Sequence, residues 1–539
     1  MKKLFKNIKK TLTDFGLSLR RFPLAIAFST ATTIVLILIV NYQSAYATNT
    51  INFLQRIAMG LALGFPLFLF INLLFERLSN YKKITKMFIQ LGGGILLLLF
   101  YFYFLSELNM VMITRFIALN LALYLMVLLV QYFYDRDNFE LYVVHLFTRF
   151  FISGIYAIVL YGGLAATLFT LNKLLGLPVS SELYLTTWLS VIGIFAPIFL
   201  LAGVPVYRKE FNLKDFPEFL KILLLYIVMP IISVYTTILY IYFIKILATW
   251  QWPQGLVAHL VLWYSMISLI VIFFISPLRK QNNLVRFFIF WFPKTILPLL
   301  GMMFFAIWIR INAYGVTENR YFVVLFGLWV FGMMMYYNFI KQKRNIILPL
   351  SLAVIAVLSV FGPWSSFSVS INSQNKRFEK ILSRNNMIKD EKIIKKEGSI
   401  AKKDQKEIKA IITYFNNKHS LQKLKYLPPD FSTQKMEEVF GFKYRFRSTK
   451  PNNQPLRNNI DDKTDFIKEE IVSYFPMLEG MYYQYRGKGN EYAALKRDIK
   501  HVKKPFIQIH DNNGGTTIAT VYKVEENQIV IVSRKEEFY

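Results

Sequence analysis

Two arginines in one short stretch, Arg310 and Arg320, could bind the phosphate groups of lipids. They flank a turn in "IWIRINAYGVTENRYF", which begins at Ile307. A guanidinium group is a planar set of donors that matches a phosphate or carboxylate group. With the hydroxyl, acidic and aromatic side chains nearby, and a tryptophan that follows later, they define a candidate site: Arg310, Tyr314, Thr317, Glu318, Arg320 and Trp364.

Two hypotheses explain this set of side chains. The first is a small binding site for an anionic group. The second is a structural clamp, in which Glu318 pairs with either arginine and the loop holds a neighbouring part of the chain. The clamp is the favoured interpretation, because arginines at a membrane surface commonly extend toward the headgroups and pair locally.

Other chemistry is sparse in the sequence. There is no cysteine, which excludes thiol catalysis, disulfides and thiolate metal sites. The phosphate-loop, nucleophile-elbow, zinc-protease and dinucleotide-binding motifs do not occur. Of the five histidines, only His501 and His510 lie near each other, and neither has a carboxylate at metal-ligand spacing. We therefore expect no cofactor and no metal. A non-enzymatic protein is favoured over an enzyme.

The composition indicates a membrane protein. Hydrophobic residues make up 55% of the 539 residues, aromatic residues make up 17%, and the mean hydropathy is +0.38. Soluble domains are about 45–50% apolar even when glycine is counted. The net charge of +30 comes from short basic clusters between apolar runs, not from one continuous basic face, so nucleic-acid binding is disfavoured.

Apolar runs long enough to cross a bilayer alternate with short polar gaps up to about Trp364. They predict an α-helical polytopic protein with about eleven transmembrane helices, of which the ninth is short. Lys294, after "RFFIFWFP", is interpreted as an interfacial lysine at the start of that ninth span. The expected spans are Phe22–Tyr42, Phe53–Phe75, Met87–Leu105, Phe116–Phe133, Phe150–Leu171, Tyr184–Val206, Phe219–Ile244, Leu256–Pro277, Ile296–Ile309, Tyr321–Ile340 and Ile346–Gly362.

The charges of the gaps predict the orientation. Lysine and arginine near span ends are retained in the cytoplasm. In this chain, 23 of them lie before the first span or in every second gap after it, and only six lie in the other gaps. The N-terminus is therefore expected in the cytoplasm, where residues 1–21 form a basic amphipathic segment. After a bundle over residues 22–363, an odd number of spans would place the C-terminus outside.

Residues 364–539 have the mixed charge of a water-soluble domain. Apolar spacing predicts helices over Ser373–Asn385 and Lys403–Asn416, and "FSTQKMEEVFGF" predicts a short helix that ends before Gly441. The segments "PFIQIH", "TTIATVYKV" and "NQIVIV" predict an antiparallel meander. The expected fold is an extracytoplasmic α+β domain on the same side as the arginine loop. There the arginines could meet the start of that domain, or the phosphates of anionic lipid headgroups.

Two segments carry a resemblance to a known family. They are "RINAYGVTENRY" at Arg310–Tyr321 and "FGPWSSFSVSINSQNKR" at Phe361–Arg377. The chain resembles, up to about Tyr444, the bacterial membrane family called domain of unknown function 4153. The resemblance implies a multi-pass protein of the cell membrane and supplies no catalytic residue.

Three functions from different classes remain open. The first is an envelope-associated scaffold or binding protein that presents an outer domain and contacts the lipid bilayer, its anionic headgroups or envelope components. The second is a transporter or a lipid-handling protein, for which intramembrane prolines such as Pro197, Pro230 and Pro298 would matter. The third is a membrane enzyme that acts on lipid-linked envelope substrates. The scaffold is the favoured hypothesis.

Overall fold

The structure is a computed structural model that divides the chain into two compact units, Met1–Arg445 and Phe446–Tyr539. In the first unit it describes residues 15–42, 48–77, 82–105, 109–132, 138–206, 210–250, 256–389, 392–395 and 400–444. In the second unit it describes five strands between 482 and 533. Most of the basic segment expected at residues 1–21 lies outside these ranges.

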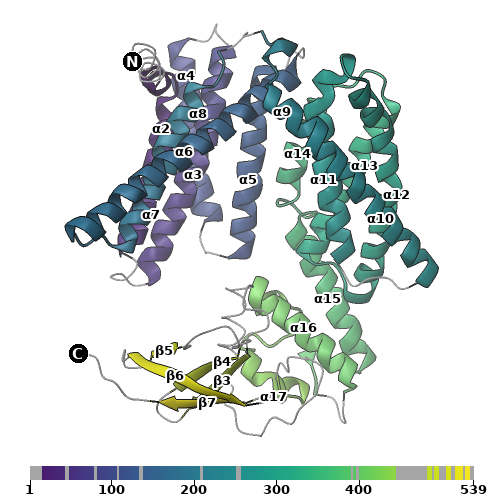
Figure 1. The fold of residues 1–539 in the computed structure, drawn as a ribbon. Coiled ribbons are helices and arrows are strands. Elements are labelled where there is room, and N and C mark those ends of the chain that lie inside the picture. The colour runs from purple at the N-terminus through teal and green to yellow at the C-terminus, as the bar shows by residue number, and fades with distance from the viewer. Residues whose placement is uncertain are drawn as a thin grey trace. The chain divides into compact units, whose positions relative to one another are not determined.

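Ten helices in the described part of the first unit are long and apolar enough to cross a membrane (Figure 1). Seven are single elements: α2 (Pro23–Tyr42), α3 (Thr48–Arg77), α4 (Lys83–Phe104), α5 (Met110–Leu129), α6 (Phe139–Leu175), α12 (Asn283–Tyr314) and α13 (Glu318–Phe339). Three combine shorter pieces: α7 (Ser181–Ser190), η2 (Val191–Phe195) and α8 (Ala196–Ala202); α9 (Glu218–Ile222), η4 (Leu223–Val228) and α10 (Met229–Thr249); α11 (Leu256–Ile275) and η5 (Ser276–Lys280). By length and composition, the chain is a multi-pass membrane protein.

Three of the expected spans differ clearly from the structure. The span expected at Phe150–Leu171 is longer, because α6 begins at Phe139 and has 37 residues. The ninth is not short, because α12 continues through Pro293 and Pro298 for 32 residues and begins well before Lys294. The eleventh is a helix of only 12 residues, α14 (Ile347–Leu358). At 1.5 Å per residue it is about 18 Å long, against roughly 30 Å for the hydrocarbon core. It stops early because the backbone turns at Gly362, whose φ is +82°.

The proline at one helix interruption is compensated by a neighbouring helix. The π-helical turn η2 directly precedes α8, which has Pro197 in its first turn. Proline removes one helical hydrogen bond and frees the carbonyl four residues earlier, that of Gly193. The hydroxyl of Ser29, on α2, donates to that carbonyl over 2.6 Å. The irregular backbone is thus satisfied within the protein, as the bilayer requires.

Helix α15 (Ser366–Arg384) and helix α16 (Lys402–Lys418) begin a smaller layer that continues the first unit. Its other elements are β1 (Ile388–Lys389), β2 (Lys392–Ile393), η6 (Leu421–Lys423), η7 (Thr433–Lys435) and α17 (Met436–Phe440). Its apolar core includes Phe378, Leu382, Ile408, Ile412 and Phe415. We call α15–α17 with the segments between them the helical platform. Figure 1 shows it at the end of the bundle where α12 passes into α13.

The platform helices begin and end for local reasons. α15 starts seven residues before the expected helix, because the hydroxyl of Ser365 accepts a hydrogen bond from the Ser368 amide and caps the helix. α17 ends where Gly441 takes a left-handed conformation with φ +78°. The sequence also predicts that this helix ends before Gly441.

The second unit contains antiparallel strands. β3 (Tyr482–Gly487) pairs with β4 (Glu491–Lys496), and β6 (Thr516–Glu525) lies between β5 (Phe506–His510) and β7 (Gln528–Ser533). A register shift between Val521 and Lys523 interrupts the pairing of β6 with β7. The three strands of the second sheet fall on the three segments expected to be strands. That platform and strands form one α+β domain stays a prediction.

Candidate functional site

The turn between α12 and α13 is built around a glycine and an arginine. α12 ends at Tyr314, and Gly315 follows with φ +69°, a conformation that glycine adopts without strain. Arg320 reaches back from the first turn of α13 and donates from Nη1 to the Gly315 carbonyl over 2.6 Å and to the Tyr314 carbonyl over 3.2 Å. Its guanidinium also lies 5.6 Å from the centre of the Tyr314 ring. Arg320 therefore closes its own turn.

Helix α15 holds the same turn from the other side. The Val316 amide donates to Ser373 Oγ over 2.8 Å. Gln374, which is almost fully buried, donates from Nε2 to the carbonyls of Val316 over 2.9 Å and Tyr314 over 3.1 Å. Arg377 Nη1 adds a 3.3 Å bond to the Tyr314 carbonyl. These bonds satisfy backbone groups that a helix–helix turn leaves open, so the turn and α15 fix each other.

Glu318 is the buried centre of the contact between α13 and the platform. Its Oε1 accepts a 2.5 Å hydrogen bond from the Tyr414 hydroxyl and lies 2.8 Å from Nε2 of His419. Because a carboxylate oxygen only accepts, Nε2 is the protonated ring nitrogen in this arrangement. The side chains of Glu318 and His419 are only 5% and 1% exposed. A single carboxylate oxygen thus joins the bundle to two side chains of the platform.

Burial has an electrostatic consequence at this contact. Burial, and then the hydrogen bond to Glu318, raises the pKa of Tyr414 far above its ordinary value near 10. Tyr414 therefore stays protonated and remains a donor. Two atoms, Glu318 Oε2 and His419 Nδ1, are buried and have no hydrogen-bond partner among the residues that the structure describes.

Positive charge gathers beside the turn. Arg310 and Arg377 lie close enough to Arg320 to repel its charge. Arg377 is compensated by a 3.1 Å ion pair with Glu407 on α16. Arg310, partly exposed on the last turns of α12, makes no hydrogen bond to another described residue. Arg310 is thus the arginine of this group whose guanidinium has no partner among the described residues.

The last two candidate residues have smaller roles. Thr317 begins α13 with an extended backbone, but its hydroxyl does not cap the helix, and only its carbonyl is used, by the Tyr321 amide over 2.8 Å. The backbone carbonyl of Trp364 accepts a 2.8 Å hydrogen bond from the Tyr321 hydroxyl, and Trp364 as a residue is 55% exposed. Neither side chain meets the arginines through a hydrogen bond between described residues.

The structure adds partners that the sequence did not indicate. Gln374 and Arg377 lie in the second segment of the family resemblance but were not assigned to the site. Tyr414 and His419 were missed, because they lie about a hundred residues after Glu318 and no spacing rule joins them. No group of three or more histidines and carboxylates suited to a metal occurs among the described residues. What the arrangement provides is a set of directional hydrogen bonds between two layers.

By its fold and this junction, the protein is a multi-pass membrane protein whose last long helices hold a helical platform. Comparison with known proteins identifies its family. Residues 24–384 match the family described as Domain of unknown function (DUF4153), and the chain belongs to it. The matched range contains both segments that meet at the α12–α13 turn.

One curated relative is the uncharacterised protein PM1469 of Pasteurella multocida (strain Pm70). It is 24% identical over 214 residues, which cover 39% of this chain and 35% of the relative. The match thus spans about a third of the relative's length. No solved structure matches the chain significantly.

Proposed function

We propose that this protein is an envelope-associated membrane scaffold, in which the bundle anchors the helical platform and presents the C-terminal unit at the outer face. The observation that carries the proposal is the buried Glu318, which accepts from Tyr414 and contacts His419. A carboxylate is costly to bury, and removing its partners is strongly destabilising, so this contact resists separation. A platform held in this way is better suited to presenting the C-terminal unit than to moving relative to the bundle.

The orientation and the partners belong to the same proposal. The basic gaps favour a cytoplasmic N-terminus and therefore an extracytoplasmic location for residues 364–539, as one α+β domain. Arg310 keeps donors available beside the arginine cluster, which supports contact with anionic lipid headgroups or acidic envelope components. In this arrangement Glu318 and Arg320 act as the clamp, and Arg310 forms an exposed cationic edge.

Hydrogen exchange of the full chain in lipid nanodiscs tests the anchoring. If the platform is anchored, amides of α16 exchange slowly, because their opening requires the Glu318 contact to open. Amides of α16 that exchange as fast as those of an unprotected helix would show a platform that detaches freely, and the scaffold would lose its basis.

A transporter is the second candidate, and a specific observation favours it. Two spans contain π-helical turns, η2 and η4, next to Pro197 and Pro230, and such turns often mark functional sites. A transport cycle would alternate the water access of this region. The scaffold predicts constant access for a cysteine placed at Ile192 in η2, and the transporter predicts two states.

A further inference from the structure

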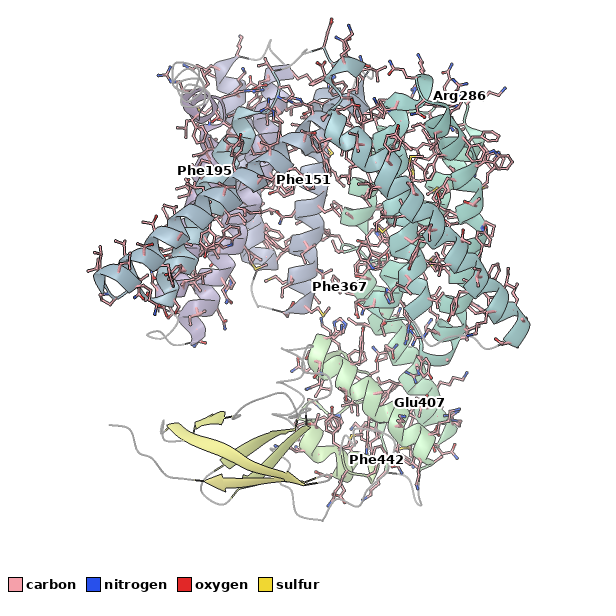
Figure 2. All side chains as sticks on the ribbon, viewed as in Figure 1. Phe151, Phe195, Arg286, Phe367, Glu407 and Phe442 are labelled. Atoms are coloured by element: carbon pink, nitrogen blue, oxygen red, sulfur yellow. The ribbon has the colours of Figure 1, made fainter. Side chains whose placement is uncertain are left out.

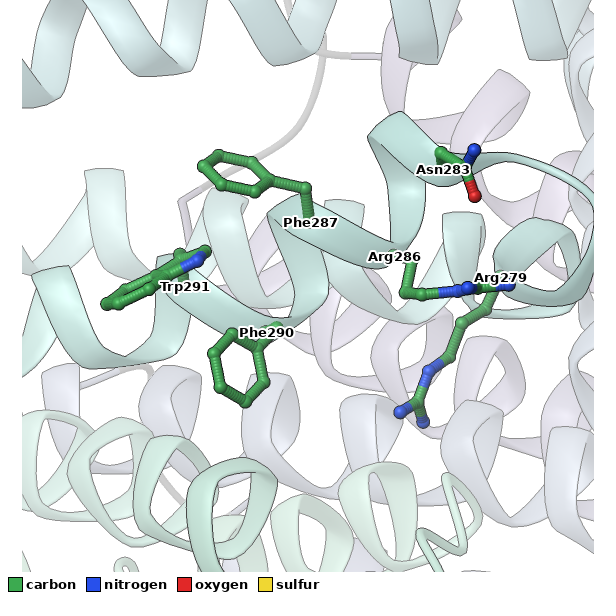
Figure 3. A pocket seen from close by; sticks show the side chains of 6 residues that line it. All are labelled: Arg279, Asn283, Arg286, Phe287, Phe290 and Trp291. Atoms are coloured by element: carbon green, nitrogen blue, oxygen red, sulfur yellow. The ribbon is translucent and has the colours of Figure 1, made fainter.

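A pocket lined by two arginines and three aromatic rings lies at the end of the bundle away from the platform. Its volume is about 400 Å³, and its lining residues are Arg279, Asn283, Arg286, Phe287, Phe290 and Trp291. Figure 3 shows Arg279 and Arg286 together at one side, with the aromatic rings beyond them. Figure 2 places Arg286 at the opposite end of the bundle from Glu407 of the platform. This pocket is therefore distinct from the α12–α13 junction.

Helix periodicity creates the lining. All the lining residues except Arg279 lie on α12 at intervals of three or four, which places them on one helical face. That face is exposed: Phe287 is 65%, Phe290 53% and Trp291 49% accessible. On a span that crosses a bilayer, an exposed aromatic face of this kind meets lipid chains, not the protein core.

The charges of the pocket are uncompensated. The side chains of Arg279 and Arg286 make no ion pair or hydrogen bond with another residue in the described part of the chain. Lys294, one turn further along the same face, lies 3.4 Å from the centre of the Phe290 ring. Burial, and then the charges of Arg279 and Lys294, lower the pKa of Lys343 in the following basic loop. Four cations thus share one region, and an anion there would relieve their repulsion.

We infer that this pocket binds the phosphate headgroup of an anionic phospholipid, held between Arg279 and Arg286 with its acyl chain along Phe287, Phe290 and Trp291. Arginine matches the geometry of a phosphate group, and basic pockets at helix ends on the positively charged side of a membrane protein suit anionic headgroups. The aromatic face selects a lipid over a free phosphate, because it offers an apolar surface continuous with the cationic end. The pocket lies in the leaflet of the basic gaps.

The test measures lipid binding to the purified full chain by native mass spectrometry, with phosphatidylglycerol and phosphatidylethanolamine as probes. The variant Arg279→Gln/Arg286→Gln removes both charges from exposed positions. Each basic residue near a lipid headgroup contributes about 1 kcal/mol of binding free energy. The double variant is therefore expected to bind phosphatidylglycerol roughly thirty-fold more weakly. The matched control, Lys83→Gln/Lys341→Gln, removes two exposed cations outside the pocket and should leave this binding unchanged.

Two further arms decide the ligand. Arg279→Lys/Arg286→Lys keeps the charge and should retain most of the binding, which separates loss of charge from loss of folding. Phe287→Ala/Trp291→Ala should weaken phosphatidylglycerol binding, because the acyl chain of the lipid loses the aromatic surface along which it lies. Equal weakening in the Lys83/Lys341 control, no preference over phosphatidylethanolamine, or full displacement by inorganic phosphate would each overturn the inference. The inference does not depend on the scaffold, because every residue tested lies away from the platform.

Discussion

Glu318→Ala is the substitution that should damage the junction most. It removes the acceptor of the Tyr414 hydroxyl and of His419 Nε2 while both partners stay buried. A buried donor left without an acceptor costs about 1–3 kcal/mol. The Tyr414 hydroxyl lies 3.0 Å from His419 Nε2 and can bond to it once the carboxylate is gone, so one donor is left without an acceptor and the cost is about 1–3 kcal/mol. Little of this is screened by solvent, because the Glu318 side chain is only 5% exposed. The free energy that opens the platform should fall by that amount.

Hydrogen exchange of α16 measures this free energy directly in the full chain. A loss of 1 kcal/mol, the lower limit, speeds exchange about five-fold, since each 1.4 kcal/mol is a factor of ten. The control is Glu218→Ala, which breaks the exposed pair with Lys221 and should change stability by less than about 0.5 kcal/mol. Exchange of α16 that is as slow in Glu318→Ala as in the wild-type protein would refute the reasoning, because the contact would then carry no energy.

Three other predictions concern the same architecture. Arg320→Ala should speed external proteolysis near Ser365–Asn375 more than Arg310→Ala, because only Arg320 bonds the turn carbonyls; equal rates would contradict this. Since the folded-state pKa of Tyr414 is raised, its contribution is complete below pH about 10 and is lost as the pH rises further, so the difference in Tm between wild type and Tyr414→Phe should shrink above pH about 10 and not below it. Gly64→Ala should cost about 1–3 kcal/mol, because its methyl group would overlap the Phe28 ring, whereas Gly92→Ala, with open space around it, should be neutral or stabilising in thermal unfolding.

The spans could be predicted because length and hydrophobicity alone determine them. The ninth and eleventh spans show where local rules fail. Lys294 after Pro293 predicts a late start for the ninth span, yet α12 continues through Pro293 and Pro298, and the carbonyl of Thr295 between them accepts a hydrogen bond from Tyr240 on α10. α14 is shorter than its apolar run because the chain must turn before Ser365 to begin α15.

The candidate site was only partly visible in the sequence. The turn and its charged residues could be located, because glycine, tyrosine and arginine at that spacing predict a polar loop between two spans. Which side chains meet them could not be predicted. Tyr414 and His419 reach Glu318 only because the apolar face of α16, formed by residues such as Ile408 and Phe415, packs on α15 and turns its end toward α13. Which side chains contact Glu318 therefore depends on tertiary packing and not on the local sequence pattern.

The most direct test of the central claim uses the absence of native cysteine. A single cysteine at Asn319, beside the junction, or at Lys341, in the basic gap at the other end of α13, can be labelled in intact cells with a membrane-impermeant maleimide. If the junction and platform lie outside, Asn319→Cys is labelled in intact cells and Lys341→Cys only after permeabilisation. Labelling of Lys341→Cys alone in intact cells would reverse the orientation and contradict the presentation of the platform at the outer face.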